Sequence, residues 1–311
     1  MTVANTGGWN NLPSGNFIPE IYSKNVQKFL RKVAVVSDIT NTDYFGEIAN
    51  FGDTVRIIKE PSISVTAYTR GLSLNTEQLA DDQLTLTVDQ ANYFQFAVDD
   101  IEAKVAHINW TDMAIGSAAY SLRNTFDSAV LSYMRGQAPS GNIVGADSAT
   151  STGDITSTSA AMDLGYGAGE VSPLRMMARA RRKLNDQDAP EDNRWFVAPP
   201  DFWEIMEDEN SKLLDRDFSS DSDSKLRNGR VTEGLIRGFR CYMSRNLPAA
   251  SSATNSILFG HMSSTATASQ IAKTEVLRSE DFFGDKTRGL HLFGRKTLRT
   301  ETLGTGYYVI D

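Results

Sequence analysis

The chain has 311 residues, of which 40% are hydrophobic and 23% charged, a composition ordinary for a globular protein. Its formal net charge is −8, with 31 Lys and Arg against 39 Asp and Glu, which excludes a protein that wraps nucleic acid through basic groups. No apolar stretch is long enough for a membrane helix, and the first residues lack the pattern of a secretory signal, so we expect a soluble protein that stays where it is made and contacts no membrane. The single cysteine, Cys241, excludes an internal disulfide and a Cys-based zinc cluster.

Residues 1–50 are predicted to form an extended arm followed by a short helix. Residues 1–16 are rich in Asn, Gly, Ser and Thr, and Trp9 is their only large anchor. Pro19 suits the first turn of a helix. From there to Val33 apolar residues recur on one side, while Lys and Arg residues line the other.

Residues 51–98 are predicted to form a long β-hairpin. Apolar and polar residues alternate in 55–67 and again in 84–88, on either side of a turn-prone region at 69–82. Two arms of about twenty residues would reach about 60 Å when fully extended, beyond a domain that should be about 40 Å across. Because an isolated two-stranded ribbon is only marginally stable in water, we expect something outside this chain to hold the hairpin.

Residues 99–136 are predicted to form one long helix. Apolar residues recur at spacings of three and four from Ile101 to Tyr133, with Asp99 or Asp100 as the N-terminal cap and Gly136 at the C-terminal end. A helix of about 35 residues is roughly 50 Å long and about three times the usual length.

Shorter elements are predicted in the rest of the chain. Residues 137–170 are rich in Gly, Ser, Thr and Ala and are expected to form a loop or a small surface insertion. The last forty or so residues are expected to return as strands to an earlier sheet. The predicted elements are helices at 173–184 and 201–214, and strands at 194–197, 236–244, 256–260, 271–276, 290–293 and 307–310.

No catalytic or metal-binding constellation is found, and we expect neither an enzyme nor a cofactor. Gly289–Thr297 resembles a phosphate-binding loop only superficially, because Arg295 separates the second glycine from the lysine. Residues 221–223 begin like a calcium loop that then lacks its Gly and its Glu. Cys241 has no histidine near it in sequence, and the histidines are widely separated. They are His107, His261 and His291.

Charges are segregated in the second half of the chain. Residues 173–184 carry five basic residues and no acid, whereas residues 201–223 carry nine acids and two bases. Arg175, Arg179 and Arg182 share one face of the predicted helix. Two interpretations remain open: a solvated surface with pairs inside the chain, or a basic face of one copy that meets the acidic segment of the next around a ring.

Five short motifs accompany this order of elements. They are Phe17–Ile21 (FIPEI), Phe51–Val55 (FGDTV), Tyr93–Asp100 (YFQFAVDD), Gly234–Phe239 (GLIRGF) and Asp285–Gly294 (DKTRGLHLFG). Together they resemble the major capsid proteins of tailed double-stranded DNA phages. The resemblance implies an α+β fold of the Hong Kong 97 type, with an N-terminal arm and short helix (1–50), an extended β-hairpin or E-loop (51–98), the spine helix of a peripheral domain (99–136), an axial domain (137–270) and a return to the peripheral domain (271–311).

The resemblance also implies a function, that of a subunit that self-assembles into hexamers and pentamers of an icosahedral shell around double-stranded DNA. The implied partners are other copies of the chain, a portal, and a separate scaffolding protein, since little sequence precedes Phe17. The shell would enclose DNA without sequence-specific binding, and would be made in the host bacterial cytoplasm and found in the virion. Some family members cross-link a hairpin lysine to an Asn of a neighbour, but no lysine lies between Lys59 and Lys104, so we expect a non-covalent shell.

The candidate subunit-interface residues lie in the arm, the hairpin and the two charged segments. They are Trp9, Arg70, Leu72, Leu74, Arg175, Arg179, Arg182, Asp215 and Asp217. Three other functions remain open: an encapsulin-type shell that encloses a protein cargo, a hydrolase with an unfamiliar site, and a minor structural protein of a phage.

Overall fold

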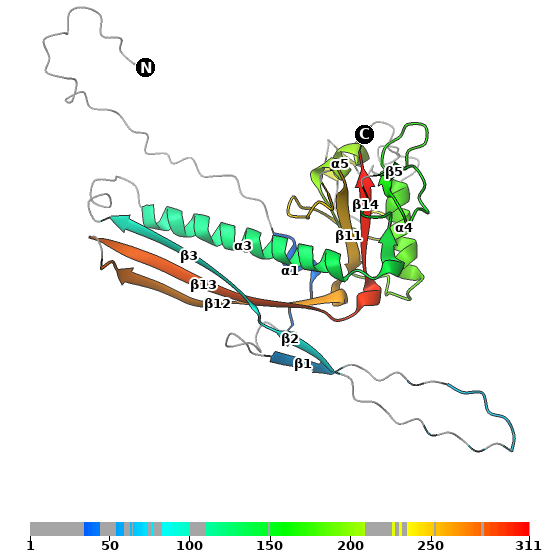
Figure 1. Ribbon diagram of the computed structural model, residues 1–311, viewed down its shortest axis with the longest axis horizontal. Helices are drawn as coiled ribbons and strands as arrows, with labels where there is room; N and C mark the ends of the chain where they lie inside the picture. Colours follow the sequence, from blue (N-terminus) through cyan, green and yellow to red (C-terminus); the bar gives the residue numbers. More distant parts are fainter. Residues whose placement is uncertain are drawn as a thin grey trace, which may run out of the picture.

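Two β-sheets joined by one long helix make up most of the structure (Figure 1). The seven-stranded sheet and its helices lie at one end of the helix, and a three-stranded sheet runs along the helix. The computed structural model describes residues 34–43, 54–58, 63, 65–71, 73, 76, 83–99, 110–148, 150–208, 226–227, 230–231, 235–251, 253–280 and 283–310.

The seven-stranded sheet has the order β10-β7-β11-β14-β6-β5, with β4 beside β14. Its strands are β4 (Ile143–Val144), β5 (Ser151–Thr152), β6 (Ala161–Asp163), β7 (Arg194–Ala198), β10 (Arg240–Met243), β11 (Asn255–His261) and β14 (Leu303–Val309). The prediction of a surface loop over 137–170 is therefore wrong, because this segment supplies three strands to the sheet, and Val144 and Met162 are buried in the core. β14 also belongs to this sheet, so the last strand returns to an earlier sheet as expected, but this sheet is not the one that contains β12 and β13.

Both faces of the seven-stranded sheet are covered. Successive side chains of a strand point to opposite faces, so Phe196 of β7 packs in one cluster while Trp195 and Val197 pack in another. Helices α4 (Pro173–Asn185) and α5 (Pro200–Met206) cover the first face, and α1 (Val36–Ile39) and the end of α3 (Trp110–Gln137) cover the second. A strand buried on both faces reads as a continuous apolar run, which explains the sequence of β7.

The three-stranded sheet has the order β12-β13-β3 and lies against α3. Its strands are β3 (Gln90–Asp99), β12 (Thr265–Arg278) and β13 (Gly284–Thr297). The described part of α3 is 28 residues long, or about 42 Å. Asp99 lies in β3 and so does not cap the helix, and Gly136 lies inside the helix, which continues to Gln137. The residues between β3 and α3 lie outside the described part of the chain.

Among its described residues, the predicted hairpin is paired only near its base. β1 (Thr54–Ile58) and β2 (Gln83–Thr87) form an antiparallel ladder from Thr54↔Thr87 to Ile58↔Gln83. The described residues at 63–76 form no strand, and residues 90–98 belong to β3, so the prediction of two arms of about twenty paired residues is wrong. Leu86 packs on β12 and β13, and β13 passes so close that a Cβ at Gly294 would lie 2.5 Å from the Thr87 carbonyl oxygen.

Several other predictions are confirmed. Helix α4 spans 173–185, where Pro173 suits its first turn, and β7, β10 and β11 occupy the predicted strand regions. Helix α5 ends at Met206, before the predicted 214. The predicted helix after Pro19 lies outside the described residues. The remaining elements are a small hairpin, β8 (Leu226–Arg227) and β9 (Arg230–Val231), and the short 3-10 turns Ser140–Asn142, Met262–Ser264 and Thr300–Thr302.

A buried carboxylate joins α1, α3 and the segment after β10. Asp127 of α3 is completely buried, and its Oδ1 accepts hydrogen bonds from the backbone N–H groups of Val35 and Val36, both at 3.0 Å. Its Oδ2 accepts one from Asn246 Nδ2 at 2.9 Å. A buried charge is tolerated only when such groups satisfy it. Asp127 therefore fixes where the chain that precedes α1 joins the body.

We predict that Asp127→Ala lowers the free energy of unfolding by roughly 3 kcal/mol, because it leaves two buried N–H groups without an acceptor. Asn124→Ala is the matched control, since Asn246 keeps its hydrogen bond to Asp127 when the Asn124 partner is removed; its cost should stay below about 1 kcal/mol. Urea unfolding of the isolated subunit measures both. Equal costs would contradict the role given to Asp127.

A histidine lies inside the contact between α3 and the three-stranded sheet. His291 of β13 is stacked on Phe293 with ring centroids 5.6 Å apart, and Phe126 of α3 meets its ring edge-on at 5.8 Å. Its Nε2 is 3.1 Å from Ser269 Oγ. Burial lowers the pKa of His291, because the charged form is desolvated there. The folded state therefore favours the neutral imidazole.

We predict that the subunit is less stable at acid pH. Because the pKa of His291 is lower in the folded state, its contribution is complete above about pH 6.5 and is lost as pH falls below that value. His291→Gln should flatten the dependence of the unfolding free energy on pH between about 7.5 and 5. A residual slope should remain from His261, whose pKa burial also lowers. An unchanged slope in the variant would contradict the prediction.

Candidate assembly surfaces

The hairpin exposes apolar side chains that no other described residue covers. Ile58 is 82% exposed, Val65 99% and Tyr68 70%, and Arg70 is exposed beside them. Gly71 follows with φ +95°, a left-handed conformation that suits a turn. Contiguous exposed apolar groups of this kind mark contact surfaces. The other predicted contact residues of this region and of the arm lie outside the described residues; they are Trp9, Leu72 and Leu74.

The three-stranded sheet has an outer face, turned away from α3, that sequence reasoning missed. Register places Tyr93 beside Leu290 on this face, and Gln95 beside Arg288. Tyr93 is 77% exposed, and Arg288 donates two hydrogen bonds to Glu275 Oε2, at 2.8 and 2.6 Å. A hollow of about 310 Å³ lies among these side chains. The outer face therefore combines exposed apolar groups with a fixed ion pair.

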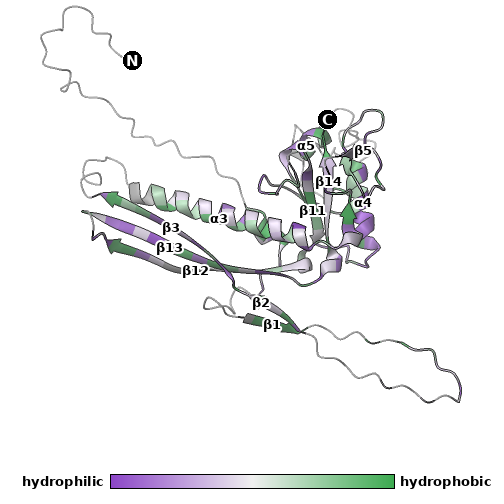
Figure 2. Ribbon diagram, viewed as in Figure 1, coloured by the Kyte–Doolittle hydropathy of each residue, from purple (hydrophilic) through white to green (hydrophobic). Residues whose placement is uncertain are grey.

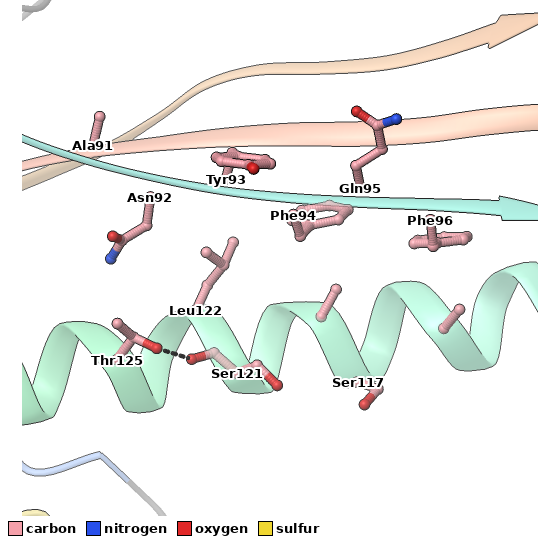
Figure 3. Close-up of a pocket in the computed structure, with 12 residues that line it drawn as sticks. Ala91, Asn92, Tyr93, Phe94, Gln95, Phe96, Ser117, Ser121, Leu122 and Thr125 are labelled. Carbon is pink, nitrogen blue, oxygen red and sulfur yellow. Dashed lines mark hydrogen bonds between the residues drawn. The ribbon is translucent and has the colours of Figure 1, made fainter.

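The opposite face of β3 meets α3 across a groove of about 600 Å³. In Figure 3, Asn92, Phe94 and Phe96 point from β3 toward the helix, while Tyr93 and Gln95 point away from it. The helix offers Leu122 and small side chains such as Ser121. The lining contains hydroxyl, amide and apolar groups but no carboxylate, histidine, cysteine or lysine. Among the described lining residues, the serine and threonine hydroxyls therefore have no carboxylate or imidazole beside them to act as a general base.

The charged segments form two surfaces on one domain. Arg175 and Arg182 of α4 are exposed and Arg179 is half-buried, and Arg182 lies 3.6 Å from Asp186 of its own chain. The structure thus places the three arginines on one helix, as predicted. The acidic segment begins on α5 with exposed Asp201, Glu204, Glu207 and Asp208. The predicted contact residues Asp215 and Asp217 lie outside the described part of the chain.

The described cysteine is buried and the described His261 lies beside a serine hydroxyl, as is usual for structural residues. Burial raises the pKa of Cys241 to about 12, so the thiol stays protonated and unreactive. His261 Nδ1 lies 2.8 Å from Ser263 Oγ, and His107 lies outside the described residues. Within the described part of the chain, no group of three or more His, Cys, Asp or Glu side chains could hold a metal ion. Among the described helices, none is both long and apolar enough to cross a membrane.

Comparisons with known proteins find similarity at the level of structure. No family model and no curated protein sequence matches the chain. A solved structure described as Mycobacterium phage Che8 superimposes with a TM-score of 0.73 at 23% identity, over 94% of this chain and 97% of that one. The capsid structure of the cyanophage P-SCSP1u gives a TM-score of 0.64 at 14% identity, over 97% and 96%.

A third structure comes from a different kind of particle. The capsid of an empty GTA particle, computed with C5 symmetry, gives a TM-score of 0.62 at 10% identity, over 98% of this chain and 99% of that one. Nearly the whole chain is covered in each case. The chain therefore has the α+β fold of phage capsid structures, the Hong Kong 97-type fold.

Proposed function

We propose that the chain is the major capsid protein of a tailed double-stranded DNA phage, a structural subunit that self-assembles into the pentamers and hexamers of an icosahedral shell. The observation that carries the proposal is the hairpin, which projects from the body with Ile58, Val65 and Tyr68 exposed (Figure 1). A segment with so few contacts to its own domain needs a partner to order it. The solved structures with this fold include capsids.

The partner of the hairpin is another copy of the same chain. Each copy presents two uncovered apolar surfaces, the hairpin and the outer face of the three-stranded sheet with Tyr93 and Leu290. Burial of both surfaces between copies would remove several exposed aromatic and aliphatic side chains from water, and permanent interfaces derive most of their stability from such burial.

The charge of the chain indicates how the shell would contact the DNA that it encloses. With a net charge of −8, the chain lacks the cationic surplus that tight DNA binding requires. The shell would therefore enclose DNA without sequence-specific contacts. A scaffolding protein and a portal are proposed as partners during assembly, in the host bacterial cytoplasm, with the mature protein found in the virion.

Three rival functions make different predictions. An encapsulin-type shell would contain a protein cargo instead of genome-length DNA, and the phage and GTA neighbours favour the first proposal over this one. A hydrolase would show turnover as a monomer or small oligomer. A minor structural protein of a phage would be present in few copies per particle.

Electron microscopy of the purified chain, alone and with its scaffolding protein, tests the proposal. We expect closed particles from the natural chain. Replacement of residues 59–82 by Asn-Gly should leave β1 and β2 paired, because Ile58 is opposite Gln83. This variant should keep the thermal stability of the subunit but fail to form particles. Small discrete oligomers from the natural chain under every condition would overturn the proposal.

The shell should be held without covalent links through the hairpin. The sequence from Glu60 to Ala103 contains no lysine, so the tip of the hairpin has no amine to form an isopeptide bond. Boiled particles should migrate as a single subunit band on a denaturing gel. A ladder of linked subunits would contradict this prediction.

A further inference from the structure

Two surfaces of opposite charge lie on the seven-stranded sheet domain without being paired to each other. On α4, Arg175 and Arg179 project from the side opposite the buried Met176 and Met177; we call this pair the basic face. Glu204 on α5 and Glu207, the residue directly after α5, are exposed near the buried Trp203; we call this pair the acidic face.

The basic face has no carboxylate partner within the described residues. Arg181 and Arg182 do have partners, Glu191 at 3.1 Å and Asp186 at 3.6 Å, but no described carboxylate lies within 4.0 Å of Arg175 or Arg179. Positive charge is concentrated here: burial, and then the nearby Arg179, lower the pKa of Lys183. Like charges this close together are unfavourable until an anion approaches them.

One acid does lie near the basic face, but its oxygens are occupied. Asp154 accepts hydrogen bonds from the backbone N–H and the hydroxyl of Thr156, both at 2.8 Å. The hydrogen bond from the Thr156 N–H is the main cause of the lowered pKa of Asp154, and the charges of Arg175 and Arg179 add to it. Asp154 thus offsets part of the positive charge from a distance and leaves both guanidinium groups open to a partner.

The acidic face is also unpaired in the described part of the chain. No described cation lies within 4.0 Å of Glu204 or Glu207, while Asp201 accepts a hydrogen bond from Asn255 Nδ2 at 3.0 Å. The two helices share one hydrophobic cluster. In Figure 1, α4 runs along one side of the domain and α5 lies toward the other, and Figure 2 shows the hydrophilic outer side of α4.

We propose that the basic face of one copy binds the acidic face of the next copy, head to tail, around the axis of a ring. The inference rests on the proposed function, because only a self-associating chain brings the two faces together. In a two-fold contact, both faces of one copy would have to meet the same neighbouring copy. Faces on different sides of a domain instead favour a heterologous contact, in which each face meets a different copy and the series of contacts closes into a ring. Complementary charge of this kind sets register and association rate.

Charge reversal tests the contact. R175E/R179E and E204R/E207R should each slow the association of purified subunits by about tenfold or more at low salt, because steering becomes repulsion. The variant that carries all four substitutions (the four-fold variant) exchanges the charges of the two faces and should recover most of the natural association rate. Light scattering follows the rate, and native mass spectrometry identifies the rings. Raised salt should slow the natural chain, because it screens the attraction, and should speed the single-face variants, because it screens the repulsion.

Two controls keep the result interpretable. R123E/R245E changes the net charge as much as R175E/R179E does, on exposed positions of α3 and of the segment after β10, and should associate nearly as fast as the natural chain. R175Q/R179Q removes charge without adding repulsion and should have an intermediate effect. Circular dichroism and thermal unfolding of each variant verify the fold; three of the four reversed side chains are exposed, and the fourth, Arg179, is half-buried.

The outcomes separate this inference from the proposed function. A natural chain that forms no particles overturns the proposed function. A natural chain that forms particles, with both reversals equally fast, overturns only the contact between the two faces. Two slow reversals without recovery in the four-fold variant also overturn it, because each face then meets some other surface. The contact between the two faces is supported only if both reversals are slow and the four-fold variant recovers most of the natural association rate.

Discussion

The arrangement of the two sheets depends on α3, because this one helix packs against both of them. Its C-terminal part packs Val130, Leu131 and Met134 against the seven-stranded sheet, while Phe126 packs on β13 of the other sheet. Asp127 lies between these two contacts and binds the backbone of α1. Because a buried carboxylate requires every one of its partners, the relative placement of helix, sheet and incoming chain is fixed at one point.

Stability and exposure are therefore divided in space. The large apolar clusters lie around the seven-stranded sheet, where both faces are covered. The hairpin, the outer face with Tyr93, and the charged sides of α4 and α5 form the periphery. A monomeric protein would gain little from such long and poorly covered parts. In a subunit that contacts several neighbours, the same parts become the interfaces, and the covered sheet supplies the free energy that keeps each copy folded before assembly.

The sequence predicted those elements whose signals are local. Helix α4 has a proline in its first turn and a clear period, and β7 is a short apolar run bounded by turn residues. β3 was assigned to the hairpin because its alternation is locally the same as that of a hairpin arm, and its partner β13 lies almost two hundred residues later. β4, β5 and β6 are only two or three residues long, too short for any period. The composition of the sequence located the charged segments. Whether a charge is paired depends on the fold, and in the described part of the chain neither Arg175 nor Glu204 has an oppositely charged side chain within 4.0 Å.

The close approach of Gly294 to Thr87 has a mechanical consequence. At the base of the hairpin, β13 comes so close to β2 that a Cβ on Gly294 would clash with the Thr87 carbonyl oxygen, so a larger residue there would push β2 away. Ile58 and Gly71 are thirteen residues apart, a reach of up to roughly 45 Å. At that reach, a tilt of about ten degrees at the base would move the tip by about 8 Å. The position of the tip therefore depends on the contact between Gly294 and Thr87. In a shell of the proposed kind, a substitution at Gly294 would alter the curvature without touching any other subunit.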